Sequence, residues 1–223
     1  MFSGAKEEFQ RQVETLVEKG YPAAYGLSET GFRDSLGALI ASVPGAPSPL
    51  DCDHGTVPFC IVIPAGLAPA EWMMSRTERH GKPGHTALTP FSSADFTVIE
   101  EVRVPVGPAY LILGVDRGSE TRKVTPETAL GRIRDRGRFP LTIDEGIAIL
   151  THHPEFLRKN NGFSLLASRR NDQRVPAIWL DGRRNPKLGW CWDRNPHTWL
   201  GSASCERRSG TTDAAVEVDH PSG

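Results

Sequence analysis

The final quarter of the chain alternates short apolar segments with turn-forming residues. The apolar segments, each of six or seven residues, lie at 163–168, 175–180, 187–192 and 198–204. Segments of that length suit β-strands and are too short for most helices. Asp181-Gly182 and residues 193–197 have the composition of turns. We therefore predict a C-terminal β-meander over residues 163–205, which requires a fold that contains an antiparallel sheet.

Helical signals occur in the first and middle parts of the chain. Phe9, Val13, Leu16 and Val17 follow helical spacing, and a second stripe begins at Phe32. Two more helix starts are marked by capping sequences, Thr125-Pro126-Glu127 and Thr142-Ile143-Asp144-Glu145. We therefore expect helices at the N-terminus and in the centre.

These elements together predict one α+β domain over residues 1–205. It has a helical N-terminal unit at residues 1–41, central helices, and a mostly antiparallel sheet that ends in the meander. Residues 206–223 contain no aromatic and few apolar side chains, so we predict a disordered tail there. A length of 223 residues suits a single domain.

The charge balance excludes some classes of partner. Lys and Arg number 26 against 27 Asp and Glu, which argues against a general nucleic-acid binder. The uncharged run at 56–70 is broken by three prolines and a glycine, so we expect no membrane span there. The first residues lack the apolar segment of a secretory signal. We therefore expect a cytoplasmic protein whose four cysteines are reduced thiols.

Four of the five tryptophans fall between Trp179 and Trp199. If residues 193–197 form a five-residue loop, the strands on either side form a hairpin in which Gly189 faces Gly201. Facing glycines often mark a place where a ligand or another backbone approaches closely. This hairpin is therefore the candidate site.

In our leading hypothesis the hairpin forms one wall of a small-molecule pocket. His197 performs the acid–base chemistry, and Asn195 and Arg194 orient the substrate. The residues assigned to substrate binding are Trp190, Trp192, Trp199, Cys191 and Ser204. The alternative interpretation is a tryptophan-rich core strand whose polar loop residues only hold the turn.

Thiol and metal chemistry are two further alternatives. Cys191 and His197 are the residue types of a thiolate–imidazole pair, although a buried, inert Cys191 explains the sequence more simply. The groups Cys52, His54, Cys60 and Cys191, His197, Cys205 contain zinc-ligand residue types. Neither group has the paired Cys-x2-Cys or His-x3-His spacing of structural zinc sites. We therefore predict no metal and no organic cofactor.

Three other segments concentrate titratable side chains. His152-His153 either offsets a helix dipole at a C-terminus or supplies a general base. The loop from His80 to His85, with nearby Arg79, is either a lid over an anionic substrate or an ordinary solvated loop. Residues 117–138 hold seven basic and three acidic side chains, which suits either a phosphate-bearing or acidic partner or a solvated helix face.

Several strings resemble a family of uncharacterised proteins from high-GC bacteria that is labelled a domain of unknown function. They are Val124-Thr125-Pro126-Glu127, residues 140–146, Arg174-Val175-Pro176-Ala177 and, most specific of all, residues 186–205. The resemblance covers roughly residues 5–208 and implies a single-domain soluble protein, but it transfers no catalytic residue. Members occur in actinomycete-type genomes, some near secondary-metabolite genes, which favours a tailoring enzyme.

We therefore expect an enzyme without organic cofactor that transforms a small molecule by cyclisation, elimination or hydrolysis in specialised metabolism. The alternative is a non-catalytic subunit that binds an enzyme or forms a homo-oligomer through an exposed tryptophan face. A weaker alternative is a zinc- or thiol-dependent enzyme. No nucleic-acid or membrane partner is expected.

Overall fold

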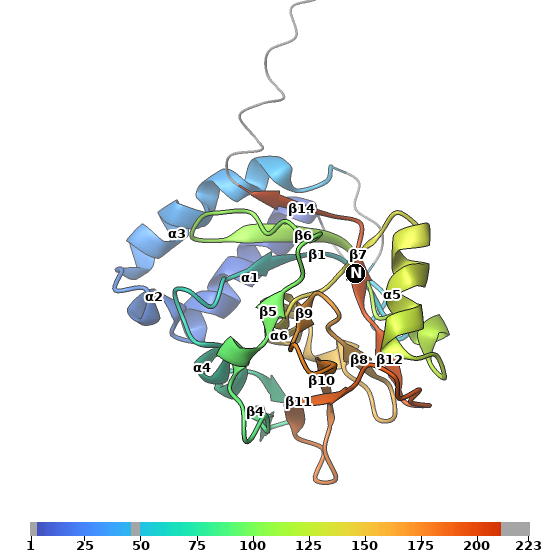
Figure 1. Cartoon of the computed structure of the whole chain (residues 1–223). Coiled ribbons are helices and arrows are strands. Elements are labelled where there is room, and N and C mark those ends of the chain that lie inside the picture. Colours follow the sequence, from blue (N-terminus) through green and yellow to red (C-terminus); the bar gives the residue numbers. More distant parts are fainter. Residues whose placement is uncertain (1–3, 46–49, 211–223) are drawn as a thin grey trace, which may run out of the picture.

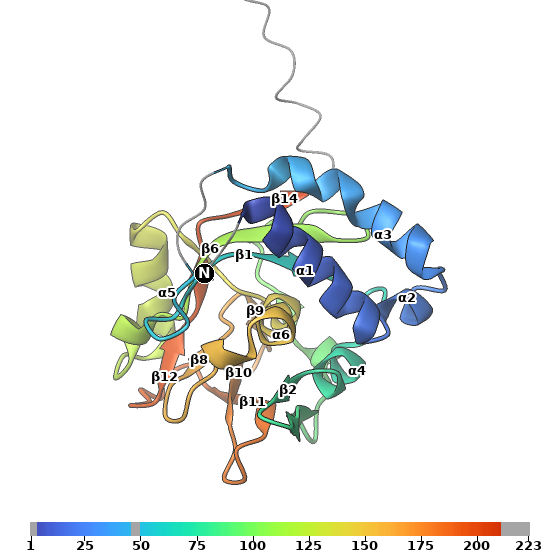
Figure 2. The same cartoon turned by 180° about the vertical axis from the view of Figure 1, so that it is seen from behind.

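The computed structural model describes residues 4–45 and 50–210 of the chain. Helix α6 (Ile143–His152) lies at its centre, between two β-sheets (Figures 1 and 2). Every residue of this helix except Asp144 is buried. A helix that is buried all round belongs to the core, so α6 is the element on which both sheets pack.

The first sheet contains five antiparallel strands. They are β1 (Thr56–Val62), β6 (Tyr110–Asp116), β7 (Phe139–Pro140), β13 (Ser204–Cys205) and β14 (Arg207–Gly210). Strand β6 pairs with β1 along one edge and with β13 and then β14 along the other. Six of the seven residues of β1 are buried, which explains why this strand is a continuous apolar run.

The second sheet is mixed. In spatial order its strands are β12 (Leu200–Ser202), β8 (Gly162–Ser164), β10 (Arg174–Leu180), β11 (Pro186–Trp192) and β4 (His85–Thr86). The three central strands are antiparallel, whereas β12 and β4 pair in parallel at the two edges. Helix α5 (Pro126–Asp135) packs on this sheet through a small second core.

The remaining elements surround these layers. The helices are α1 (Ala5–Glu18), α2 (Tyr21–Ala24), α3 (Glu29–Gly37) and α4 (Ala70–Ser75), with short 3₁₀ turns η1 (Ala38–Ser42), η2 (Ser93–Asp95), η3 (Ser119–Thr121) and η4 (Pro154–Phe156). Two small ribbons pair β2 (Glu78–Arg79) with β3 (Lys82–Pro83) and β5 (Thr97–Val98) with β9 (Ser168–Arg169). Helix α1 packs on both β1 and α6 (Figure 2).

The predicted α+β class and the helix starts are confirmed. The Thr125 hydroxyl accepts a hydrogen bond from the Thr128 N–H, and Pro126 is the first residue of α5. Thr142 and Glu145 form the expected capping box at the start of α6. These caps are local, because the side chain satisfies backbone N–H groups that have no partner within the helix.

The predicted meander is correct for β8, β10 and β11 and wrong for the last strand. Strand β12 does not return along β11 but crosses to the far edge of the sheet and pairs with β8. The intervening loop is held by the segment before and at the start of α5. Lys123 N donates to His197 O at 2.8 Å, and Glu127 N donates to Asp193 O at 3.1 Å.

The predicted glycine pair is therefore separated. A side chain at Gly201 would clash with the backbone of Gly118, and a side chain at Gly189 would clash with the indole of Trp179. Both glycines do allow another group to approach closely, but the group is a different one at each position. The predicted tail is also wrong at its start, because residues 207–210 form β14; residues 211–223 lie outside the described part of the chain.

Candidate functional site

Most of the predicted site residues surround one small cavity on the second sheet. This tryptophan cavity, of about 240 Å³, is lined by Trp179, Trp190, Cys191, Trp192, Asn195, His197, Trp199 and Leu200. Trp190 and Trp192 lie on one face of β11, with ring centroids 5.6 Å apart. Trp179 and Trp199 make a second pair at 5.6 Å and pack on the small core under α5. The indoles thus form two packed pairs on the second sheet.

His197 is the titratable group of this cavity. Its ring lies 5.0 Å from that of Trp199, and its Nε2 is buried without a hydrogen-bond partner. Burial lowers the pKa of His197, so the imidazole is neutral at neutral pH. Asn195 is exposed, and its backbone N–H closes the turn to Trp192 O at 3.1 Å.

Two of the assigned residues lie elsewhere. Arg194 is exposed, points toward Glu127 at 4.0 Å and does not line the cavity. Ser204 belongs to the first sheet, where its hydroxyl accepts a hydrogen bond from Arg138 Nε at 2.8 Å. Neither residue lies with the others at the cavity, because the chain after residue 192 crosses the sheet instead of closing a hairpin on β11.

The cysteines do not provide a reactive thiolate. Burial raises the pKa of Cys191 to about 11 and that of Cys205 to about 12, so both thiols are protonated at neutral pH. All four cysteines are unpaired, and burial also raises the pKa of Cys52 and Cys60. Among residues 4–45 and 50–210, no three His, Cys, Asp or Glu side chains lie close enough together to hold a metal ion.

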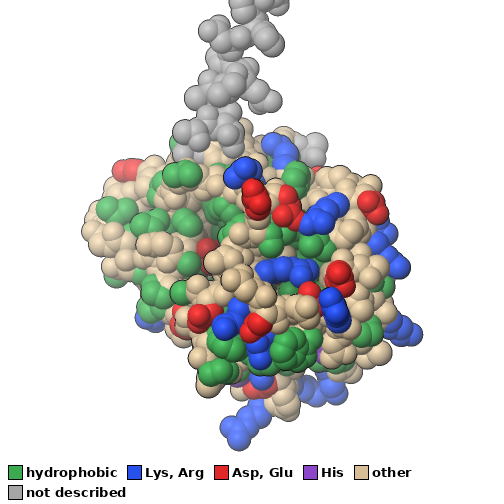
Figure 3. All heavy atoms as spheres, in the orientation of Figure 1, with side chains coloured by type: hydrophobic (Ala, Val, Ile, Leu, Met, Phe, Trp, Pro, Cys, Tyr) green, Lys and Arg blue, Asp and Glu red, His purple; other side chains and the backbone are tan. Residues whose placement is uncertain are grey.

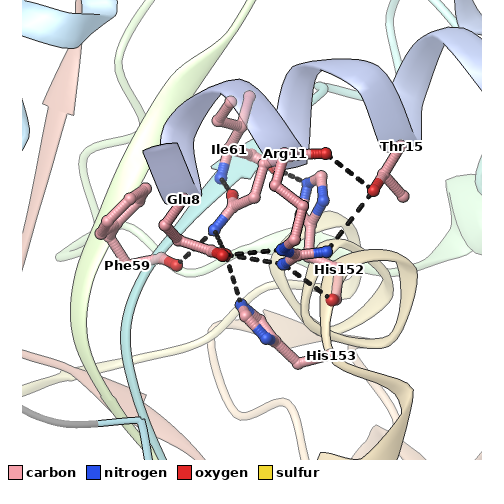
Figure 4. Close-up of polar contacts among 8 residues, drawn as sticks. Glu8, Arg11, Thr15, Phe59, Ile61, His152 and His153 are labelled. Carbon is pink, nitrogen blue, oxygen red and sulfur yellow. Dashed lines mark hydrogen bonds and ion pairs between the residues drawn. The ribbon is translucent and has the colours of Figure 1, made fainter. Parts of the chain in front are cut away.

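The two adjacent histidines belong to a buried polar network between α1, α6 and β1 (Figure 4). His152 Nε2 donates to Ile61 O at 3.0 Å, and His153 Nε2 lies 3.5 Å from a carboxylate oxygen of Glu8. Glu8 is already bound by two nitrogens of Arg11, at 2.6 and 2.7 Å. Burial lowers the pKa of both histidines, to about 4 for His153. Neither offsets the helix dipole as a cation, and neither lines the tryptophan cavity.

A larger cavity lies at the other end of α6. This Asp144 cavity, of about 450 Å³, has an apolar part formed by Phe96, Val98, Val104 and Ile143 and a polar part formed by Glu71, Ser93, Tyr110, Thr142, Asp144 and Ser168. Figure 3 shows a hollow on the face that carries β5. An apolar cavity with a few converging polar groups is the usual form of a small-molecule site.

Asp144 is the one residue of α6 that is only partly buried, and it lines this cavity. Its Oδ2 accepts a hydrogen bond from Ala65 N at 2.8 Å. Burial raises the pKa of Asp144 to about 6, and the nearby Glu145 adds to the rise. A carboxyl group with that pKa exchanges its proton near neutral pH.

Neighbouring contacts fix the wall that carries Asp144. The Glu145 carboxylate binds Arg208 through two hydrogen bonds, at 2.6 and 2.8 Å, and accepts a third from Tyr110 Oη at 3.1 Å. Ser168 Oγ accepts from Ile143 N at 3.1 Å in the first turn of α6. Elsewhere in the lining, Glu71 accepts hydrogen bonds from the backbone N–H and the hydroxyl of Ser93. Hydrogen bonds therefore hold the residues around the carboxyl groups of this cavity in place.

Residues 15–211 match the model of one protein family, described as a family of unknown function (DUF5701). The chain belongs to the DUF5701 family. No curated protein and no solved structure matches this DUF5701 chain. None of the helices in residues 4–45 and 50–210 combines the length and apolar character needed to cross a bilayer.

Sequence reasoning missed Asp144 in this DUF5701 chain because an acid in the first turn of a helix is ordinary. The capping box accounts for Thr142 and Glu145, and the helix dipole favours an acid such as Asp144 in the first turn. The available signal was the apolar run that follows, from Ile147 to Leu150. An acid at the start of a helix that is buried all round is shielded from solvent unless it faces a cavity.

Proposed function

We propose that this DUF5701 protein is an enzyme that transforms a small organic molecule in the Asp144 cavity by acid–base chemistry, without an organic cofactor. The observation that carries the proposal is the position of Asp144, a carboxyl group with one backbone hydrogen bond on the wall of a largely apolar cavity. The proposal keeps the reaction class expected from the sequence. It moves the acid–base role from His197 to Asp144, because the Asp144 cavity is the larger of the two.

The lining defines the substrate that would fit. The apolar side chains favour a molecule with a hydrocarbon or aromatic part, and the hydroxyls of Ser168 and Thr142 offer hydrogen bonds to its polar end. Asp144 would remove or supply a proton at that end, and Glu71 provides a second carboxylate for the opposite transfer. Cyclisation, elimination and hydrolysis can each use such a pair. A place in specialised metabolism and in the cytoplasm remains a prediction of the sequence.

The first test needs no substrate. We expect the carboxyl carbon of Asp144, followed by NMR during a pH titration, to give a pKa of about 6, because burial disfavours its charged form. Asp144→Asn removes this transition and retains the fold, since the amide oxygen can still accept from Ala65 N. A transition near the ordinary value of 3.8 contradicts the proposal.

The second test uses binding and turnover. Small aromatic and carbonyl compounds are screened by thermal shift, and hits are assayed for conversion. We expect Asp144→Asn to lower turnover by about 100-fold or more, because a general acid or base typically contributes that much. The matched control, Asp135→Asn, changes an exposed acid at the end of α5 and leaves turnover unchanged. Equal turnover in both variants would exclude Asp144 as the proton carrier.

A second candidate function, a complex-forming subunit, is favoured by one observation. The side chain of Trp192 is 44% exposed and lies beside Trp190, with the guanidinium of Arg174 over both rings. Exposed aromatic and arginine side chains are enriched at protein interfaces. A partner protein or a second copy of the chain would cover this face.

Quenching by acrylamide tests whether this face is open. We expect the fluorescence of the protein to contain one readily quenched component that disappears in Trp192→Phe, because the other four indoles are only partly exposed. Trp179→Phe is the control, since its ring packs on the small core. If Trp192→Phe leaves quenching unchanged at a protein concentration where native mass spectrometry shows a monomer, the face is not open and the second candidate fails.

A further inference from the structure

A third cavity, larger than the two described above, is lined by cations. This basic cavity, of about 720 Å³, contains six basic side chains, Arg79, Lys82, Arg122, Arg158, Lys159 and Arg184. No Asp or Glu lines it. The whole chain has a net charge of −1, so this concentration is local and is not a consequence of composition.

Four separate segments contribute these cations. Arg79 and Lys82 come from the β2–β3 ribbon, Arg122 follows η3, and Arg184 lies in the turn between β10 and β11. The segment 158–161, which follows η4, supplies the rest. The His80–His85 loop and the basic segment 117–138 are far apart in the sequence. In the structure, Lys82 of the loop and Arg122 of the segment line the same cavity.

Most of the positive charge in the cavity is not neutralised. Glu155 pairs with Arg79 at 3.0 Å, and Asp53 pairs with Arg158 at 3.0 Å. Within residues 4–45 and 50–210, the other four cations form no ion pair with a carboxylate: Lys82, Arg122, Lys159 and Arg184. Like charges around one cavity repel each other, so an anion that enters it gains from several at once.

Two residues that line the cavity also carry a buried polar atom that lacks a partner. Arg79 Nε and Asn161 Oδ1 are buried without a hydrogen bond. Buried groups of this kind are uncommon in folded proteins, and a ligand is one way in which they are satisfied. Arg79 Nε can donate to an anionic oxygen, and Asn161 Oδ1 can accept from a hydroxyl or amino group.

The backbone is unusual at three points around this cavity. His80, Asn160 and Arg184 have φ values of 51°, 56° and 66°, in the left-handed region that non-glycine residues seldom adopt. They are three of the five such residues in the described chain, and each lies in a different loop. Conformations of this kind concentrate at ligand sites.

We propose that the basic cavity binds a small molecule that carries two or three linked phosphate groups. Arginine side chains match phosphate oxygens with paired hydrogen bonds, and several of them around one cavity favour a ligand with several negative charges. A concave site of this volume suits a small molecule, whereas a nucleic acid needs an extended basic stripe. This site shares no lining residue with the Asp144 cavity, so the proposal stands or falls separately from the proposed enzymatic function.

The experiment is titration calorimetry of the full chain with inorganic tripolyphosphate and with adenosine triphosphate. We expect one binding site, with an affinity that falls as the salt concentration rises. Equal affinity for the two probes supports recognition of phosphate alone. Tighter binding of the nucleotide supports an additional contact to its organic part, for which Asn161 is placed. Failure of both probes to bind overturns the proposal.

Two adjacent arginines provide a matched pair of variants. Arg184 lines the cavity, whereas Arg183, in the same turn, does not. We expect Arg184→Gln and Arg122→Gln each to weaken tripolyphosphate binding by about 10-fold, because each removes charged hydrogen bonds. Arg183→Gln, with the same change of charge, leaves the affinity within about two-fold. Equal losses for Arg183→Gln and Arg184→Gln would overturn the site in favour of a general charge effect. Tighter binding of single-stranded oligo-dT than of tripolyphosphate would overturn it in favour of nucleic acid.

Discussion

Replacing Arg208 by methionine is expected to lower the free energy of unfolding by about 3–5 kcal/mol, the usual cost of removing one partner from a buried ion pair. The Arg208 side chain is 5% exposed and that of Glu145 is fully buried. Arg208 also donates to Pro140 O at 2.7 Å, so it connects β14, β7 and α6. Without it, the Glu145 carboxylate remains in the core with no cation to balance its charge.

Urea unfolding followed by tryptophan fluorescence measures this loss. Arg207→Met is the matched control, because Arg207 is the exposed neighbour in the same strand, and its replacement should change stability by less than about 0.5 kcal/mol. The double variant Glu145→Gln, Arg208→Met should be more stable than Arg208→Met alone, because it no longer buries an unpaired carboxylate. Glutamine at position 145 can still complete the capping box. If the two single losses simply add in the double variant, the ion pair is not what holds β14.

This pair explains why composition misjudged the start of the tail. Residues 206–210 contain no aromatic and no aliphatic side chain that would predict burial. The segment is ordered because β14 pairs with β6 and because a charged group, Arg208, finds a buried carboxylate 63 positions earlier in the chain. A signal of that kind appears only when two distant residues are brought together.

The fold prediction was accurate where a feature depends on residues close in sequence and failed where it depends on distant ones. The helix starts at Thr125 and Thr142 depend on hydrogen bonds between residues three positions apart, and the sequence predicted both of them. Strand order depends on distant partners, and here sequence failed for β12. Its pairing with β8 is decided by contacts that the loop after β11 makes with the segment before α5.

The candidate sites also differ in whether their lining residues are close together in the sequence. The tryptophan cavity could be predicted because its lining comes from one stretch, apart from Trp179. The lining of the Asp144 cavity comes from at least five separate stretches between Ala65 and Ser168. In the basic cavity, Arg79 and Arg122 belonged to segments that sequence had already marked as basic. Their proximity to Arg184 is a property of the fold alone.

The buried histidine pair predicts a strong dependence of stability on pH. An unfolded histidine has a pKa of about 6.5. In the folded protein, burial lowers the pKa of His153 to about 4 and lowers that of His152 well below its ordinary value. Between about pH 6.5 and pH 4 the unfolded chain therefore binds more protons than the folded one. Stability falls as the pH is lowered through this range, by about 1.4 kcal/mol per pH unit for each histidine, and above it the pair has no effect.

Glu8 acts at lower pH. Burial alone would raise its pKa, but the hydrogen bonds from Arg11 and Gln12 outweigh burial and lower it. A carboxylate with a lowered pKa loses its stabilising contribution only as the pH falls below its ordinary value of 4.5. Because Arg11 already neutralises Glu8, the carboxylate 3.5 Å from His153 does not keep that imidazole charged. The histidines therefore determine the first part of the acid transition, and Glu8 contributes to the second.

Urea unfolding at intervals from about pH 8 to about pH 5 measures the histidine effect. The double variant His152→Gln, His153→Gln should flatten the slope below about pH 6.5, since glutamine offers a neutral donor and binds no proton. His80→Gln is the control, because the side chain of His80 is 63% exposed, and its slope should match that of the unchanged protein. Should the double variant fail to fold, NMR titration of the imidazoles in the unchanged protein decides the matter. A His152 or His153 ring that titrates near 6.5 would show that the pair is not held neutral in the core.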